Sequence, residues 1–123
     1  MSALTRLTTV FVDCADPIKL AAFYQHATGW QLTDSTEDFA ALDAGPGRPA
    51  LGFARVPDHR APQWPDGGRR LHLDFAVADL DRAVADLLRL GATKPAFQPG
   101  AHAWVVLLDP EGHPFCLAPA DTD

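Results

Sequence analysis

The feature that most constrains this chain is an internal repeat, in which short motifs of the first half return in the second half. Ala15-Asp16 returns as Ala78-Asp79, and Gly47-Arg48-Pro49 returns as Gly112-His113-Pro114. Each match is short, but the spacing between the copies is nearly constant, which is typical of a duplicated structural unit. A chain of 123 residues has room for two such units, so we expect two small modules of similar architecture.

Each copy of the repeat predicts one helix. An aspartate stands at the start of each helix, where its side chain can accept a hydrogen bond from a backbone N–H, and a glycine follows the end. The helices are expected over residues 16–28 and 79–90, and the glycines that follow them, Gly29 and Gly91, share the spacing of the repeat. The second helix also has the apolar period of a helix with one buried face.

Runs of β-branched and aromatic residues, separated by glycine and proline, predict one strand before each helix and three after it. The eight strands are expected over residues 8–13, 30–34, 39–43, 50–56, 70–77, 94–97, 101–108 and 115–117. The predicted fold class is α+β, with two tandem β-α-β-β-β modules that form a curved eight-stranded mixed sheet. Within one domain, module 1 is expected over residues 5–57 and module 2 over 70–119, joined by a loop rich in proline and glycine over 58–69.

The charge pattern excludes several kinds of partner. The net charge is −6, and the only adjacent basic residues are Arg69 and Arg70. A nucleic-acid-binding face needs clustered basic side chains, so no nucleic acid is expected. No apolar run approaches membrane-spanning length and no secretory signal is present, which predicts a cytoplasmic protein without a membrane partner. The two cysteines, Cys14 and Cys116, do not form a disulfide framework.

Strand periodicity predicts where a ligand would bind. Because successive side chains of a strand point to opposite faces, each module should have one face against its helix and one free face. In the strand before the second helix, the apolar residues share one face, and His72 and Asp74 share the other. The free faces are expected to form a cup with the apolar row Phe11, Leu51 and Phe53. A concave apolar surface with a few polar groups is the usual form of a small-molecule site.

Three segments resemble the glyoxalase/bleomycin-resistance/dioxygenase superfamily, which has the vicinal oxygen chelate fold. They are Thr-Val-Phe-Val-Asp-Cys-Ala-Asp-Pro at residues 9–17, His-Leu-Asp-Phe-Ala-Val-Ala-Asp-Leu-Asp at residues 72–81, and Asp-Pro-Glu-Gly-His-Pro-Phe at residues 109–115. The most specific pieces are Asp-Cys-Ala-Asp-Pro and Asp-Pro-Glu-Gly. The resemblance covers nearly the whole chain and implies the paired β-α-β-β-β fold and a homodimer.

The resemblance also implies where a metal would lie. Metal-dependent members place four ligands, two per module, and the matching positions here are Thr9, Leu51, His72 and Cys116. Leucine cannot ligate a metal, and threonine is a poor ligand for a divalent transition metal. Asp74 lies two strand residues from His72, roughly 7 Å away, which is long for one metal to span. Two candidate ligands are fewer than a stable site needs, so we expect no metal and no other cofactor.

Each candidate site residue also has a structural interpretation. His72, positioned by Asp74, is a candidate general base or a hydrogen-bonded histidine of the cup. Cys116 is a candidate reactive thiol beside His72 or a small buried apolar residue. Trp104 can stack on a planar ligand or fill the core, and Trp64, in the loop, is expected to pack over the domain edge or a ligand. The residues expected to contact a ligand are Thr9, Phe11, Leu51, Phe53, Trp64, Trp104 and Cys116.

The sequence therefore predicts a metal-independent protein that holds an apolar or aromatic small molecule in the cup, as the drug-binding resistance proteins of this superfamily do. The alternative is a lyase- or isomerase-type enzyme of the same superfamily in which His72, with Asp74, transfers a proton, with or without a divalent metal. The expected partners are the small molecule and a second copy of the chain.

Overall fold

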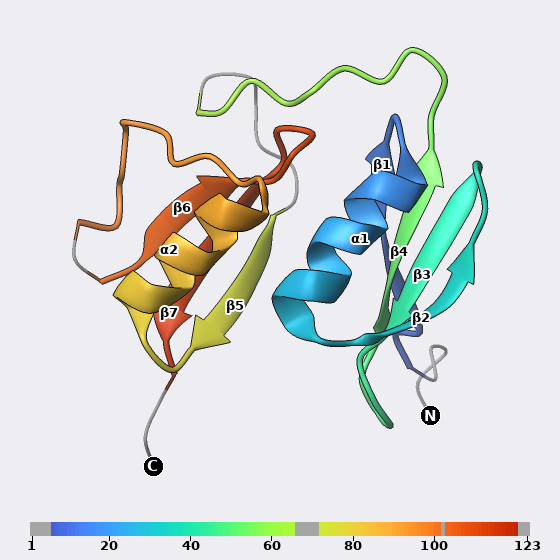
Figure 1. Ribbon diagram of the computed structural model, residues 1–123, viewed down its shortest axis with the longest axis horizontal. Helices are drawn as coiled ribbons and strands as arrows, with labels where there is room; N and C mark the ends of the chain where they lie inside the picture. Colours follow the sequence, from blue (N-terminus) through green and yellow to red (C-terminus); the bar gives the residue numbers. More distant parts are fainter. Residues whose placement is uncertain (1–5, 66–71, 102, 121–123) are drawn as a thin grey trace. The chain divides into compact units, whose positions relative to one another are not determined.

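The computed structural model describes residues 6–65, 72–101 and 103–120, and the chain divides into two compact units between Arg60 and Ala61. Each unit has its own helix and its own sheet (Figure 1). Module 1 contains β1 (Thr9–Cys14), α1 (Pro17–Thr28), β2 (Gln31–Ser35), β3 (Phe39–Asp43) and β4 (Ala50–Arg55). Module 2 contains β5 (Leu73–Val77), α2 (Leu80–Leu90), β6 (Val105–Leu108) and β7 (Pro114–Pro119). The α+β class, the tandem modules and both helices confirm the prediction.

Local capping explains why the two helices begin and end where they do. The side chain of Asp16 accepts a hydrogen bond from the backbone N–H of Lys19 at 3.2 Å, and α1 ends at Gly29 with a left-handed φ of 77°. In the second copy, Asp79 accepts from the backbone N–H of Arg82, also at 3.2 Å. Each aspartate thus satisfies one of the N–H groups that a helix start leaves without an intrahelical partner.

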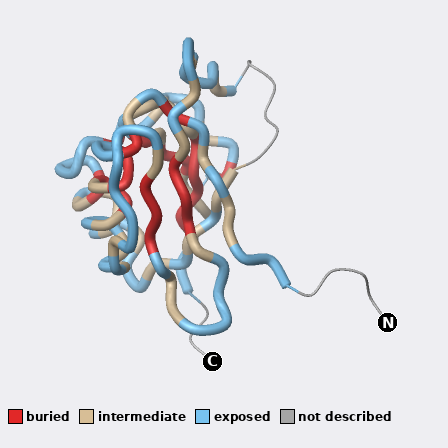
Figure 2. Tube along the Cα trace, turned by 90° about the vertical axis from the view of Figure 1, so that its right-hand side faces the viewer, coloured by how far each residue is buried: buried red, intermediate tan, exposed pale blue. Residues whose placement is uncertain are grey.

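The sheet of module 1 has the strand order β1-β4-β3-β2. β1 and β4 are parallel, whereas β3 is antiparallel to both of its neighbours. α1 packs on one face of this sheet, where Tyr24 stacks on Phe53 with 5.5 Å between ring centroids. Leu20 of α1 and Leu42 of β3 are fully buried in the same layer. Figure 2 shows the buried stretches along the strands, with exposed residues mainly in helices and loops.

The sheet of module 2 has the order β5-β7-β6, with β5 parallel to β7 and β6 antiparallel to β7. Phe75 and Phe115 meet edge to face at 6.1 Å. By the repeat, Phe75 occupies the place of Val12, which pairs with Phe53 on the helix side of module 1. The face that carries Phe75 and Phe115 is therefore the one that packs on α2. We use the term distal face for the side of each sheet turned away from its own helix.

The strand expected over residues 94–97 is wrong, because the structure has only a single bridge there, between Thr93 and Leu108. Beyond that bridge, the side-chain amide of Gln98 forms the hydrogen bonds to β6 that a strand backbone would form. It donates to the carbonyl oxygen of Val106 and accepts from the N–H of Val106, both at 2.9 Å. Proline at position 95 has no N–H to give to such a ladder.

The described residues consequently form two sheets, of four and three strands, in place of the expected single eight-stranded sheet. The strand expected over residues 101–108 is also shorter than predicted and begins at Val105. Residues 70 and 71, at the start of the expected fifth strand, lie outside the described residues.

Neither helix of the described chain has the length and the apolar run that a bilayer crossing requires. Cys14 and Cys116 lie in different modules, and neither forms a disulfide. The Cys14 thiol donates to the carbonyl oxygen of Ala54 at 3.6 Å, so this cysteine is part of the packing between β1 and β4.

Candidate functional site

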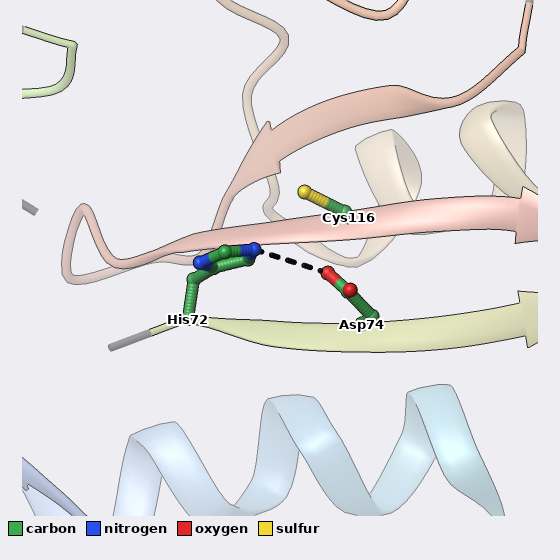
Figure 3. A group of neighbouring side chains, drawn as sticks. All are labelled: His72, Asp74 and Cys116. Carbon is green, nitrogen blue, oxygen red and sulfur yellow. Dashed lines mark ion pairs between the residues drawn. The ribbon is translucent and has the colours of Figure 1, made fainter. Parts of the chain in front are cut away.

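Three of the predicted site residues meet on the distal face of module 2 (Figure 3). His72 stands immediately before β5, Asp74 lies in β5, and Cys116 lies in β7 directly opposite Asp74. One donor atom from each of these three side chains lies within 4.8 Å of the other two. We refer to them as the polar cluster. The strand register explains the cluster, because paired residues of neighbouring strands point to the same side of a sheet.

The three side chains of the polar cluster differ in exposure. The Asp74 side chain is 74% exposed and that of His72 is 32% exposed. Cys116 is buried, with 7% of its surface exposed. The cluster thus has a carboxylate in contact with water, an imidazole at intermediate depth, and a thiol at its base. It offers an acceptor, a proton-transferring group and a nucleophile within reach of one small molecule.

The expectation that His72 and Asp74 stand too far apart for one metal to span is wrong. Their Cα atoms are two strand residues apart, but the ion-pairing atoms, His72 Nε2 and Asp74 Oδ1, are 3.3 Å apart. Figure 3 shows the two side chains turned toward each other along the strand. Spacing along the backbone sets the distance between Cα atoms, whereas two side chains that lean together can close most of it.

The distal face of module 1 carries an aromatic ring, that of Phe11, at the place that Asp74 occupies in module 2. Phe11 lies over Gly52, its partner in the β1–β4 register, so that a Cβ atom added to Gly52 would lie 2.6 Å from a ring carbon of Phe11. The same ring contacts Phe39 at a centroid distance of 5.6 Å, and Phe11 is 48% exposed. Thr9 shares this face at the start of β1 and is half-buried.

The expectation that Leu51 and Phe53 share a face with Phe11 is wrong. In the register of β1 and β4, Leu51 pairs with Val10 and Phe53 with Val12, so both point toward α1. Phe53 is fully buried there. They are core residues of module 1.

The corrected register makes Gly52, and not Leu51, the equivalent of Cys116. Thr9 and His72 hold matching places at the start of the first strand of each module, and Gly52 and Cys116 hold matching places in the strand paired with it. The four positions that the resemblance assigns to metal ligands would therefore be Thr9, Gly52, His72 and Cys116. Glycine has no side chain to ligate a metal and threonine is a poor ligand, so the four-ligand set does not fit this chain.

The two tryptophans have partners within module 2. Trp64 contacts Phe97, with 5.6 Å between ring centroids, so the loop tryptophan packs over the edge of its own module. Trp104 stands just before β6 and packs closely on Gly100, where an added Cβ atom would lie 2.4 Å from the indole ring. These contacts account for both side chains structurally and bring neither into the polar cluster.

Phe39 and Gly52 were not predicted from the sequence. The available signal was Gly52 itself, because a glycine inside a strand often marks the close approach of another group.

Asp109 and His113 belong to a hairpin turn. Asp109 is 2% exposed, accepts from the N–H groups of Glu111 and His113, and pairs with the His113 ring at 2.9 Å.

The class of the protein follows from comparison with known families. Residues 9–118 match the family model of the glyoxalase-like domain, and the chain belongs to this family. The resemblance to the glyoxalase/bleomycin-resistance/dioxygenase superfamily is confirmed. No curated protein matches the chain.

Solved structures share the fold. The chain is similar to a glyoxalase/bleomycin resistance protein/dioxygenase family enzyme from Burkholderia phytofirmans, with 26% identity, a TM-score of 0.70, and coverage of 92% of this chain and 97% of that one. It is also similar to the trypanothione-dependent glyoxalase I of Leishmania major, with 17% identity, a TM-score of 0.67, and coverage of 94% and 87%. A glyoxalase-related enzyme from Fulvimarina pelagi gives 17% identity, a TM-score of 0.67, and coverage of 95% and 89%.

Proposed function

We propose that this protein binds a neutral, apolar or aromatic small molecule at the polar cluster on the distal face of module 2, without a metal. The observation that carries the proposal is the meeting of His72, Asp74 and Cys116, with donor atoms within 4.8 Å of one another on one face of module 2. The imidazole and the carboxylate are the few polar groups that orient a ligand. Val106, the register partner of Cys116 across β6 and β7, offers apolar contact on the same face.

The proposal that no metal takes part is supported by the residues of module 1. The positions that supply two of the four ligands in metal-dependent relatives hold Thr9 and Gly52 here. A ligand of this protein would instead be held by hydrogen bonds to His72 and Asp74 and by apolar burial. Such burial contributes about 25 cal/mol per Å² of apolar surface removed from water.

A thermal-shift screen of neutral aromatic compounds, run in EDTA and again with Zn²⁺, tests the proposal. A ligand at 100 times its Kd stabilises the folded state by about 2.7 kcal/mol. For a chain of 123 residues this raises Tm by about 10 °C. We expect hits in EDTA whose affinity falls about tenfold in His72→Ala, the loss of one good hydrogen bond.

The matched control for that screen is His26→Ala, which removes an exposed histidine from the last turn of α1 in module 1. It should leave the shifts caused by the hits unchanged. Hits that stabilise the wild type and His72→Ala equally would contradict binding at the polar cluster. Hits that appear only with Zn²⁺ would contradict metal independence.

A second candidate function is proton transfer on a bound substrate by His72, with or without a divalent metal. The observation that favours it is the 3.3 Å contact between His72 Nε2 and Asp74 Oδ1, since a carboxylate that orients an imidazole is a common part of a general base. Two donors of one tetrahedral zinc ion stand about 3.4 Å apart, which is close to the observed separation of these two atoms. One zinc per chain by elemental analysis, lost in His72→Ala and in Asp74→Asn, would favour the metal-dependent form.

We further propose that the protein is a cytoplasmic homodimer. Several large apolar side chains are exposed in the described part of the single chain, and a second copy would cover part of them. They are Leu7, Phe11, Ile18, Leu88, Leu90 and Phe97. Light scattering should give twice the chain mass at micromolar concentration, and a monomer at high micromolar concentration would contradict the dimer.

A further inference from the structure

Reversible ligand binding gives roles to His72 and Asp74 but none to Cys116, the third member of the polar cluster. Its thiol, the His72 imidazole and the Asp74 carboxylate have donor atoms within 4.8 Å of one another. A thiol beside a base that is itself oriented by a carboxylate is the arrangement that activates a nucleophile. The hydrogen bonds of such groups are often loose before a ligand binds. Asp74 contacts His72 at Nε2, where a proton taken from the thiol would form an ion pair with the carboxylate.

We infer that Cys116 is a nucleophile that adds to a neutral conjugated carbonyl compound, with His72 as its base and Asp74 as a positioning residue. The inference rests on the proposed function, because the compound must first bind at the polar cluster. It adds a covalent step and a chemical class of ligand, an apolar or aromatic enone.

The step balances without any further reactant. The proton of the Cys116 thiol moves to a ring nitrogen of His72, and Sγ forms a bond to the β-carbon of the enone. The π bond between the β-carbon and the α-carbon breaks, and its electron pair is carried as an enolate. The enolate then takes the proton back from the His72 imidazolium at the α-carbon. The product is a thioether and a saturated ketone, with no leaving group, oxidant or reductant.

The surroundings of Cys116 favour a neutral apolar ligand over an anion. The Asp74 carboxylate is largely exposed beside the thiol, and the chain has a net charge of −6, so an anionic compound would be repelled. Val106 is the register partner of Cys116 across β6 and β7 and therefore shares its face. Ala76 and Ala118, paired across β5 and β7, continue the same face with small apolar side chains.

Cys14 is a built-in control for the reactivity of Cys116. It is the only other cysteine of the chain, it is fully buried in module 1, and its thiol donates to the carbonyl oxygen of Ala54. Modification of Cys14 therefore reports unfolding, whereas modification of Cys116 with Cys14 intact reports the chemistry of the folded chain.

The test treats the full chain in EDTA with 4-phenylbut-3-en-2-one and follows both cysteines by peptide mass spectrometry. We expect Cys116 of the folded wild type to react at least tenfold faster than in denaturant, although it is buried. His72→Gln should slow the reaction by about 100-fold, the usual contribution of a general base. Asp74→Asn should slow it less, and Asp74→Glu should restore most of the rate, which a merely structural role would not produce.

A rate at Cys116 that is no faster in the folded chain than in denaturant overturns the inference without any variant. The same holds if His72→Gln, with Cys14 still unmodified, reacts as fast as the wild type. The saturated ketone 4-phenylbutan-2-one separates the inference from the proposed function, because it can bind but cannot add a thiol. A thermal shift with this ketone, without a His72-dependent adduct from the enone, leaves the proposed function standing and ends the inference. If the ketone does not bind and the enone forms no adduct, both the inference and the proposed function are contradicted.

Discussion

The close approach of Phe11 to Gly52 makes a specific prediction about stability. A Cβ atom at Gly52 would lie 2.6 and 2.7 Å from two ring carbons of Phe11, so Gly52→Ala must push the ring off β4. Phe11 is 48% exposed, which leaves about 100 Å² of its side chain buried, or about 2.5 kcal/mol of apolar burial at 25 cal/mol per Å². Alanine in a strand gains about 0.5–1 kcal/mol over glycine. Gly52→Ala alone should therefore destabilise module 1 by about 1–2 kcal/mol.

The effect of Gly52→Ala on stability should change sign once the Phe11 ring is removed. In the Phe11→Ala background, Gly52→Ala should stabilise by about 0.5–1 kcal/mol, since only the strand preference of alanine remains. Urea unfolding of the wild type, both single variants and the double variant measures this coupling, which we expect to be about 2 kcal/mol. Ala76→Gly, an exposed change in β5 of module 2, is the control and should not couple to Phe11→Ala. Additive effects at Phe11 and Gly52 would refute the contact and the register on which it rests.

Further predictions concern residues that stabilise module 2. Asp109→Ala should destabilise the chain by about 2–4 kcal/mol, because it leaves two partly buried N–H groups of the last hairpin without their acceptor, and thermal unfolding measures the loss. A shift in Tm below about 2 °C would contradict this. Gln98→Leu should speed amide hydrogen exchange at Val106 at least tenfold, because the side chain carries two ladder bonds. Unchanged exchange would mean that β6 does not depend on Gln98. Gly91→Ala should destabilise module 2 by about 1–2 kcal/mol, since the φ of 118° at this position strains any residue with a Cβ atom. Urea unfolding measures the loss, and an unchanged stability would mean that α2 does not need a glycine at its end.

The parts of the fold that depend on local signals were predictable. Asp16 and Gly29 mark the ends of α1 by capping interactions that involve only neighbours in sequence. β3, a run of apolar residues between turns, was predicted with its observed bounds, Phe39–Asp43. The duplicated order of elements also followed from the repeat, because each copy carries the same caps and turns.

Features that depend on pairing between strands were not predictable. A shift of one residue in β4 exchanges the two faces, so aligning on Leu51 in place of Gly52 sent Leu51 and Phe53 to the wrong side. The segment around residues 94–97 has the composition of a strand, but the side chain of Gln98 makes the ladder bonds instead. His72, Asp74 and Cys116 were placed on one face correctly, whereas the contact between His72 and Asp74 depends on side-chain direction, which sequence spacing does not determine.

The most direct test of the central claim is a two-dimensional NMR titration of the protein in EDTA with the strongest neutral aromatic hit of the thermal-shift screen. Metal-free binding at the polar cluster predicts saturable shifts at His72, Asp74 and Cys116 and at their neighbours in β5 and β7. The same titration of His72→Ala should need about ten times more compound for the same shifts. Shifts confined to the outer surface of α2, or shifts that appear only when Zn²⁺ replaces EDTA, would contradict the account.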